Sequence, residues 1–165
     1  MKFSTQEEYG IRLMLALAQE GRSMTIPELS KREGLSEPHV AKLLMILRKQ
    51  GFINSTRGFA GGYTLAAAPE EVVVGDLLAA LGGRLYEDDF CERHRGQVSV
   101  CTHDYSCSLR SLWHGIQVAV DQVVNNITLA DLLKAEASGA AEVQFFDEPP
   151  AFVRRRELLG AGDGK

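Results

Sequence analysis

Three cysteines lie close together in this sequence. Cys91, Cys101 and Cys107 fall within 17 residues, and the chain has no other cysteine. An odd number of closely spaced thiols favours a set of metal ligands over a disulfide framework. Thiolates are soft ligands that suit iron–sulfur clusters, zinc or copper(I). Because three ligands do not complete a tetrahedral or cluster site, we expect a fourth ligand from elsewhere.

The charge of the chain is unevenly distributed. The 165 residues carry a net charge of −4, which as an average disfavours a nucleic-acid-binding protein. Residues 1–65, however, contain 9 Lys and Arg against 6 Asp and Glu, whereas residues 66–165 contain 9 against 16. A basic N-terminal part of this kind is suited to bind phosphate. The sequence therefore predicts double-stranded DNA as a partner of the N-terminal part.

The composition is that of an ordinary globular protein. Hydrophobic residues make up 45% and charged residues 24%, so we expect one packed core with an appendage. No run of about 18 apolar residues is present. The opening residues also lack the basic and apolar pattern of a signal peptide. We therefore expect a cytoplasmic protein that has no membrane partner.

The N-terminal third is predicted to form three short helices. Thr5 and Glu8 have the spacing of a capping box, which predicts the start of a first helix. A second helix is predicted to begin after Thr25 and to end at Gly34. A third is predicted over residues 37–50, with a buried apolar stripe. Two helices joined by a short turn form a helix-turn-helix.

The next segment changes to the two-residue period of strands. Residues 52–57 and 63–65 flank a glycine-rich tip, which predicts a β-hairpin. Directly after a helix-turn-helix, such a hairpin is a wing. The predicted fold class is therefore mainly α with a small β-hairpin: a winged helix-turn-helix plus a long dimerisation helix.

The long helix is predicted over residues 108–126. Its apolar residues recur every three or four positions and include Trp113, Ile116 and Val120. A stripe of this width exceeds what one small domain covers, so a second subunit is its expected partner. We therefore expect a homodimer.

The expected organisation has four parts. Residues 1–82 form the winged helix-turn-helix DNA-binding domain, which ends with a short helix over 76–81. Residues 83–107 form a cysteine-rich loop that binds the metal. Residues 108–134 form the dimerisation helices, and residues 135–165 form a C-terminal tail without a clear period.

The residues expected to contact DNA lie on the third helix and on the wing. The exposed N-terminal positions of the third helix are suited to contact base edges or phosphate in the major groove, and are equally compatible with a solvated helix face. Arg57 is suited to enter the minor groove of A·T-rich DNA, because the glycines beside it let the backbone approach closely. The candidate residues are Glu37, His39, Ala41, Lys42, Arg57 and Gly61.

At this point the sequence resembles the iron–sulfur winged-helix transcriptional regulators, the IscR-like and NsrR-like family. The resemblance covers roughly residues 1–134. It rests on the segment REGLSEPHVAKLLMILRKQGFINSTRGFAGGYTL, on the three-cysteine loop and on NNITLADLL at 125–133. It implies a homodimer that binds a pseudo-palindromic operator, and whose binding is controlled by an iron–sulfur cluster that senses iron, redox state or nitric oxide.

The resemblance also implies the cluster ligands. Cys91, Cys101 and Cys107 match the three cysteines that hold the cluster in this family. The fourth ligand of IscR-like proteins is a histidine three residues after the last cysteine, but Arg110 stands there and cannot ligate a metal. In NsrR-like proteins the other subunit donates a carboxylate from the start of its first helix, and Glu8 is the matching residue.

Several alternatives stay open. Glu8 is also expected to close the capping box, and His94 and His103 are rival fourth ligands. By resemblance to the carboxylate-ligated members we favour a 4Fe-4S cluster, with a 2Fe-2S cluster as the alternative. A winged-helix regulator with a purely structural zinc site is the alternative function. An enzyme is not expected, because no Cys/His/Asp set lies on a strand-turn-helix frame.

Overall fold

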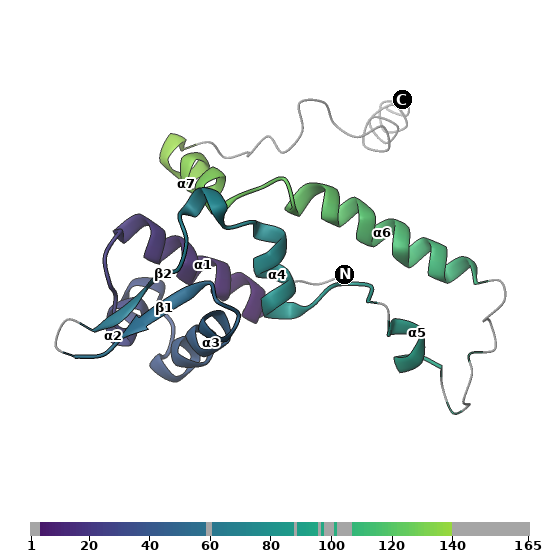
Figure 1. The fold of residues 1–165 in the computed structure, drawn as a ribbon, viewed down its shortest axis with the longest axis horizontal. Helices are drawn as coiled ribbons and strands as arrows, with labels where there is room; N and C mark the ends of the chain where they lie inside the picture. The colour runs from purple at the N-terminus through teal and green to yellow at the C-terminus, as the bar shows by residue number, and fades with distance from the viewer. Residues whose placement is uncertain are drawn as a thin grey trace, which may run out of the picture.

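The computed structural model describes residues 4–58, 61–87, 89–95, 97, 101 and 107–139 (Figure 1). This part of the chain is mostly helical and contains a two-stranded antiparallel hairpin, which confirms the predicted fold class. Within these ranges, none of the helices has the length and apolar character needed to span a lipid bilayer. The elements in chain order are α1 (Thr5–Glu20), α2 (Ile26–Glu33), α3 (Glu37–Lys49), β1 (Ile53–Thr56), β2 (Gly62–Leu65), the 3-10 helix η1 (Pro69–Glu71), α4 (Val74–Gly82), α5 (Phe90–Arg93), α6 (Ser108–Val124) and α7 (Leu129–Ser138).

The first helix begins one residue earlier than the sequence pattern predicted. The N-cap of α1 is Ser4, whose hydroxyl oxygen accepts a hydrogen bond from the Glu7 N–H at 3.3 Å. The Glu7 carboxylate accepts the Ser4 N–H at 2.7 Å, which completes a capping box. The predicted pair of Thr5 and Glu8 was wrong, because Ser4 also has a glutamate three positions on and occupies the cap. Glu8 therefore takes no part in the cap, and it is exposed.

The helix-turn-helix forms from α2 and α3 as predicted. Thr25 caps α2 in a capping box with Glu28. Hydrogen bonds from the Thr25 backbone and hydroxyl, together with Arg22, lower the pKa of Glu28 to about 2. Gly34 ends α2 in the left-handed conformation with a φ of 67°, which lets the chain turn into α3. Ser36 precedes α3 at the N-cap position, without a side-chain hydrogen bond to the helix.

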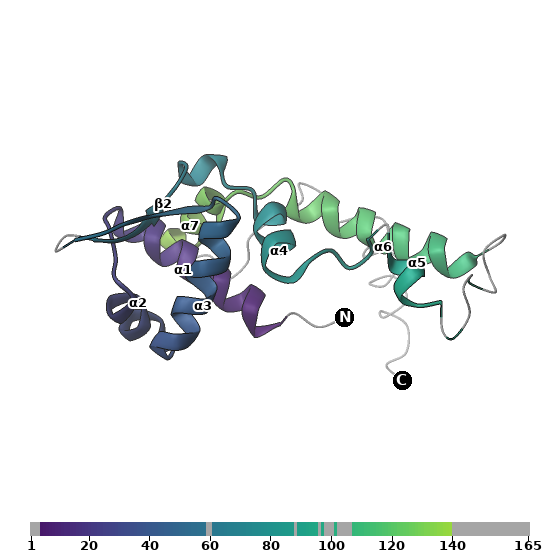
Figure 2. The same ribbon diagram turned by 60° about the horizontal axis from the view of Figure 1, so that its bottom comes forward.

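The wing is the short hairpin of β1 and β2, which extends beyond α2 (Figure 2). Its register places Ile53 opposite Leu65. A second pairing joins β2 to the segment before α2. The Tyr63 N–H donates to the Met24 carbonyl at 2.8 Å, and the Met24 N–H donates to the Tyr63 carbonyl at 3.0 Å. This pairing attaches the wing to the helix-turn-helix.

The hydrophobic core of the winged module is built around α1. Leu13, Met14 and Leu17 of this helix are at most 2% exposed. Helix α1 contacts α2, α3, α4, α7 and β2. The other fully buried side chains come from the elements around it: Leu29 of α2, Val40, Leu43, Leu44 and Leu47 of α3, Ile53 of β1, Leu77 of α4 and Leu129 of α7.

Helix α6 extends away from the winged module (Figures 1 and 2). Trp113 in its first half lies beside Phe90 of α5, with ring centroids 6.5 Å apart, and its last turns contact α4. The chain then returns to the winged module. The Val74 N–H donates to the Ile127 carbonyl and the Leu129 N–H donates to the Val72 carbonyl, both at 2.9 Å. These bonds fix the C-terminal end of α6 next to α4.

Two segments differ from the expected organisation. The predicted loop 83–107 contains the short helix α5, whose first residue Phe90 stacks on His94 just after the helix, with ring centroids 4.1 Å apart. The predicted tail 135–165 begins inside α7. Helix α7 continues into it because alanine and glutamate favour a helix even without an apolar period. Residues 140–165 lie outside the described part.

Two neighbouring residues of α3 provide a test of this core. Leu44 is fully buried, whereas Met45 is 59% exposed. We expect Leu44→Ala to lower the free energy of unfolding by about 2–5 kcal/mol, because it leaves a cavity. We expect Met45→Ala to change it by about 0.5 kcal/mol or less. Urea unfolding followed by circular dichroism measures both, and equal effects would contradict the orientation of α3.

Candidate nucleic-acid interface and cysteine site

The outward face of α3 lies opposite its buried stripe. At about 100° per residue, positions 38, 42, 45 and 49 point away from the core. Lys42, which the sequence predicted as a DNA contact, lies in the middle of this face. Glu37 is exposed in the first turn, and Ala41 is half-buried at the side. The residues at the centre of the face, all exposed, are Pro38, Lys42, Met45 and Lys49.

His39 lies at the edge of this face, towards α1. Its ring is half-buried and makes an edge contact with Tyr9, with ring centroids 5.5 Å apart. The guanidinium of Arg12 lies 5.4 Å from the centroid of the same Tyr9 ring. The sequence grouped His39 with the exposed positions because a single helix does not reveal which side α1 covers. Met45 was missed, since an apolar residue by itself gives no signal for DNA contact.

Arg57 lies at the start of the wing tip and is exposed. Among the described residues it has no hydrogen-bonding or ion-pairing partner, so its charge is available to DNA. Gly58 follows with a φ of 111°, a conformation that residues with side chains rarely adopt. At Gly61 a Cβ atom would lie 2.6 Å from the Thr56 carbonyl oxygen. Only glycine therefore fits at position 61. Because no side chain is present there, the backbone of the wing tip can approach a DNA groove closely.

A groove of about 340 Å³ lies between the wing, the start of α2 and the end of α3. Arg57 lines it from the wing and Arg48 lines it from α3. Arg48 also donates a hydrogen bond to the Ser55 hydroxyl of β1 at 3.2 Å. Arg48 was not among the residues predicted to contact DNA, although it is a basic residue in the last turn of α3. Two cations from different elements thus border the surface next to the outward face of α3.

Two of the three cysteines lie beside the same tyrosine. Cys91 belongs to α5, and Cys107 is the N-cap of α6, where its sulfur accepts the Arg110 N–H at 3.4 Å. The Tyr86 hydroxyl lies next to the Cys91 side chain. Burial raises the pKa of Tyr86, and its interactions with Cys91 and Cys107 raise this pKa further, against the opposing effect of the Arg110 charge. Tyr86 is therefore close to both cysteines.

The cysteines have the chemistry of an iron–sulfur site. All three are free thiols and half-buried, so these soft ligands are partly shielded from water. In the part of the chain that the structure describes, no group of three His, Cys, Asp or Glu side chains is close enough to hold a metal ion. Within one chain, the structure thus brings Cys91 and Cys107 near Tyr86.

The candidate fourth ligands lie in different places. Glu8 is on α1, exposed and outside the capping box. His94 follows α5, stacks on Phe90 and has its Nδ1 atom 2.8 Å from the Phe90 carbonyl oxygen. His103 lies outside the described residues.

Comparison with known proteins identifies the family. The family described as "Rrf2: Iron-dependent Transcriptional regulator" matches residues 3–135. The chain belongs to the Rrf2 family. Protein rrf2 of Nitratidesulfovibrio vulgaris is 34% identical over 136 residues, which are 81% of this chain and 88% of that protein. The solved structure of T. potens IscR has a TM-score of 0.66 at 34% identity, with 87% of this chain and 93% of that chain covered. CymR, the global cysteine regulator of B. subtilis, has a TM-score of 0.65 at 30% identity, with 81% and 97% covered.

The protein is therefore an Rrf2-family, DNA-binding transcriptional regulator and not an enzyme, which confirms the resemblance inferred from the sequence. Its winged-helix fold is shared with these relatives. The relatives include both IscR and a cysteine regulator. Members of this family therefore respond to different signals. The zinc-stabilised alternative has no support among these relatives.

The wing provides a test of DNA binding by this Rrf2 regulator. We expect Arg57→Ala to weaken binding to an A·T-containing half-site by about 1–3 kcal/mol, because the charge in the narrow minor groove is lost. Lys134→Ala is the matched control, since it removes one exposed positive charge on α7, away from the wing. Fluorescence anisotropy at fixed salt measures both. An Arg57→Ala protein that binds like the control would remove Arg57 from the interface.

Proposed function

We propose that this Rrf2-family regulator is a homodimer that binds a pseudo-palindromic operator, and that an iron–sulfur cluster on its cysteines controls this binding. The observation that carries the proposal is the position of Cys91 and Cys107 beside Tyr86, at the end of α6 that lies far from the winged module. The cysteines are thereby attached to the helix that we expect to join the subunits. A change at the cysteines then acts on the subunit interface.

The apolar surface of α6 supports the dimer. Leu109, Leu112 and Trp113 are 55%, 52% and 38% exposed. Ile116 and Ala119 continue the same stripe at intervals of three and four residues. A monomer in water rarely leaves a contiguous apolar stripe of this kind uncovered. In a dimer with a twofold axis, the stripe of one subunit packs against the same stripe of the other subunit.

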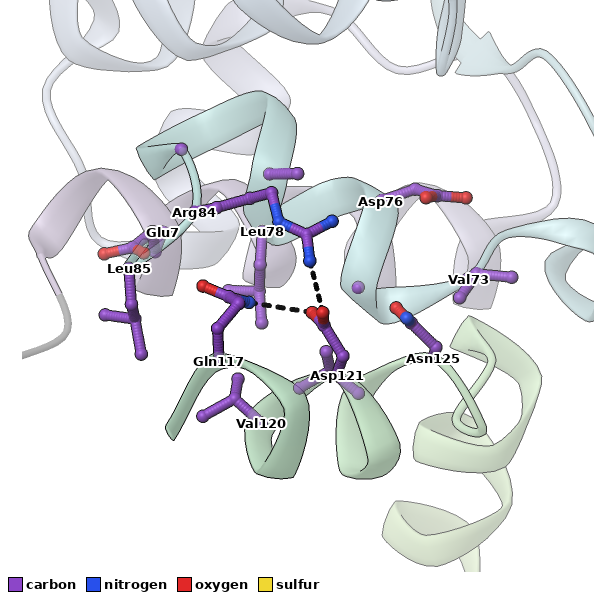
Figure 3. A pocket seen from close by; sticks show the side chains of 14 residues that line it. Glu7, Val73, Asp76, Leu78, Arg84, Leu85, Gln117, Val120, Asp121 and Asn125 are labelled. Atoms are coloured by element: carbon purple, nitrogen blue, oxygen red, sulfur yellow. Dashed lines mark hydrogen bonds and ion pairs between the residues drawn. The ribbon is translucent and has the colours of Figure 1, made fainter. Parts of the chain in front are cut away.

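Val120 belongs to the same sequence pattern but has a different position. It lines the pocket between α4 and α6 within one chain (Figure 3). Ile116 is therefore the better probe of the subunit interface. Val118, which is 40% exposed, lies about 160° around the helix from Ile116 and provides a matched control.

We expect Ile116→Asp to convert the dimer to a monomer, because the interface would bury an unpaired charge. Val118→Asp introduces the same charge on the other side of α6 and should leave the dimer intact. Multi-angle light scattering over a range of protein concentrations measures the effect. If both variants remain dimers of wild-type affinity, another surface joins the subunits.

The operator follows from the symmetry of this dimer. A twofold pair of winged modules places two α3 faces against half-sites about 34 Å apart, centre to centre. Lys42 and Met45 then face base edges in the major groove, where a methionine suits the thymine methyl group. Arg57 reaches the adjacent minor groove.

The proposed cluster ligands are Cys91, Cys101 and Cys107 of one subunit and Glu8 of the other. Because Ser4 and Glu7 form the capping box, the Glu8 carboxylate is not engaged at the helix terminus. We favour a 4Fe-4S cluster and keep a 2Fe-2S cluster as the alternative. When bound, the cluster supplies a redox-active centre that iron supply, oxygen or nitric oxide can alter. The protein residues hold it between the subunits and convert its loss into a shift of the two winged modules.

Adjacent glutamates separate the ligand role from the capping role. We expect Glu8→Ala to give a labile or altered cluster without loss of helix stability. Glu7→Ala should lower the free energy of unfolding by about 0.5–1 kcal/mol through the lost cap and leave the cluster unchanged. Anaerobic absorption spectra, iron and sulfide analysis, and thermal unfolding measure these effects. An unchanged spectrum and lifetime in Glu8→Ala would transfer the fourth-ligand role to His94 or His103.

The same preparation tests the cluster itself. Alanine at any of the three cysteines should abolish the brown colour and change operator affinity by roughly 5–150-fold, the usual range of coupling between two sites. A colourless wild-type protein that contains stoichiometric zinc would contradict the cluster.

A further inference from the structure

Gln117 is a buried polar side chain at the junction between α4 and α6. It is only 6% exposed. Its amide oxygen accepts the Tyr86 N–H at 3.0 Å, and its amide nitrogen donates to the Asp121 carboxylate at 2.8 Å. A buried amide that is bonded at both ends avoids the cost of an unsatisfied polar group. Gln117 therefore fixes the backbone of residue 86 to α6.

A second connection runs from α6 to the winged module. Asp121 forms an ion pair with Arg84, which follows directly after α4 (Figure 3). At the end of α4, the Leu81 carbonyl accepts a hydrogen bond from the Gln6 side chain of α1. The Leu81 side chain lies so close to α1 that a Cβ atom at Gly10 would overlap it. The polar contacts of α6 thus reach the helix at the centre of the DNA-binding core.

Tyr86 extends the same network to the cysteines. Its hydroxyl lies next to the Cys91 side chain. Its ring packs against Phe90 and His114, with ring centroids 5.2 and 6.4 Å apart. The residue next to Phe90 is Cys91, so a displacement of this cysteine changes the surroundings of the Tyr86 side chain. The backbone N–H of the same tyrosine is the group that Gln117 binds.

We propose that Tyr86 and Gln117 are positioning residues that couple the state of Cys91 to the contact between α6 and α4. Through that contact they set the orientation of the winged module relative to the dimer helix. The physiological input to this coupling rests on the proposed cluster, but the coupling itself requires only Cys91 and the two positioning residues. Neither positioning residue was apparent in the sequence, since a lone Gln on an amphipathic helix and a Tyr in a loop predict no such role.

The first experiment needs no cluster. In a full-length protein with Cys101→Ser and Cys107→Ser, Cys91 is alkylated with N-ethylmaleimide, and hydrogen exchange is measured over α4. We expect alkylation to accelerate exchange in α4 by roughly 3- to 10-fold, the effect of losing one or two hydrogen bonds. With Gln117→Leu added, exchange in α4 should already be fast and should not respond to alkylation. Gln122→Leu, the same substitution at an exposed position of α6, should behave like its parent.

The second experiment uses the anaerobically loaded protein. We expect the ratio of operator affinities between cluster-loaded and cluster-free wild type to be roughly 5–150-fold. Gln117→Leu and Tyr86→Phe should reduce this ratio to within about twofold while the visible spectrum is retained. Tyr86→Phe keeps the ring contacts and the backbone bond, so it remains informative if Gln117→Leu fails to fold. Gln122→Leu should keep the wild-type ratio.

The outcomes separate the two proposals. A wild-type protein that binds no cluster would contradict the proposed function, and the alkylation experiment would still decide the coupling. An exchange rate in α4 that does not respond to alkylation would overturn the coupling. The coupling would also be overturned if both Gln117→Leu and Tyr86→Phe kept the wild-type ratio of operator affinities.

Discussion

The packing of apolar side chains around α1 holds the winged module together. Leu13, Met14 and Leu17 are buried at the centre, and α2, α3, α4, α7 and β2 all lie against this helix. The outward face of α3 is defined only because its other face is buried in this core. Helix α7, which follows α6 in the chain, packs its apolar side against the core. The burial of α1 therefore determines the orientation of every segment that we expect to contact DNA.

The wing and the dimer helix are attached to this core in different ways. The wing is held by backbone hydrogen bonds between Met24 and Tyr63, and a Cβ atom at Gly62 would lie 2.5 Å from the Ser23 hydroxyl. Such a close backbone contact is stiff. Backbone hydrogen bonds hold only the C-terminal end of α6 next to α4, and the rest of the contact between these helices is partly polar and includes Gln117. Hydrogen bonds that involve side chains are individually modest, so this part of the junction is the place where a small change at the cysteines can move one part against the other.

Local signals account for the parts of the fold that were predicted. Thr25 and Gly34 mark the ends of α2 because a capping hydroxyl and a left-handed glycine act over one helical turn. The hairpin and the long helix followed from their apolar periods. Local signals failed at α1, where two neighbouring hydroxyl residues each had a suitable glutamate and Ser4 took the cap. They failed again at α7, whose C-terminal turn is helical without being amphipathic.

The sequence by itself determined the fold class, the family resemblance and the set of cysteines, because these depend on residue type and on spacing along the chain. Only the tertiary structure decided which side chains meet. It turned His39 towards Tyr9 and left Met45 outward, because α1 covers one side of α3. It also brought Tyr86 to the cysteines and Gln117 to Tyr86 across 31 positions of the chain. Contacts of this kind arise from the packing of distant elements, and no local pattern encodes them.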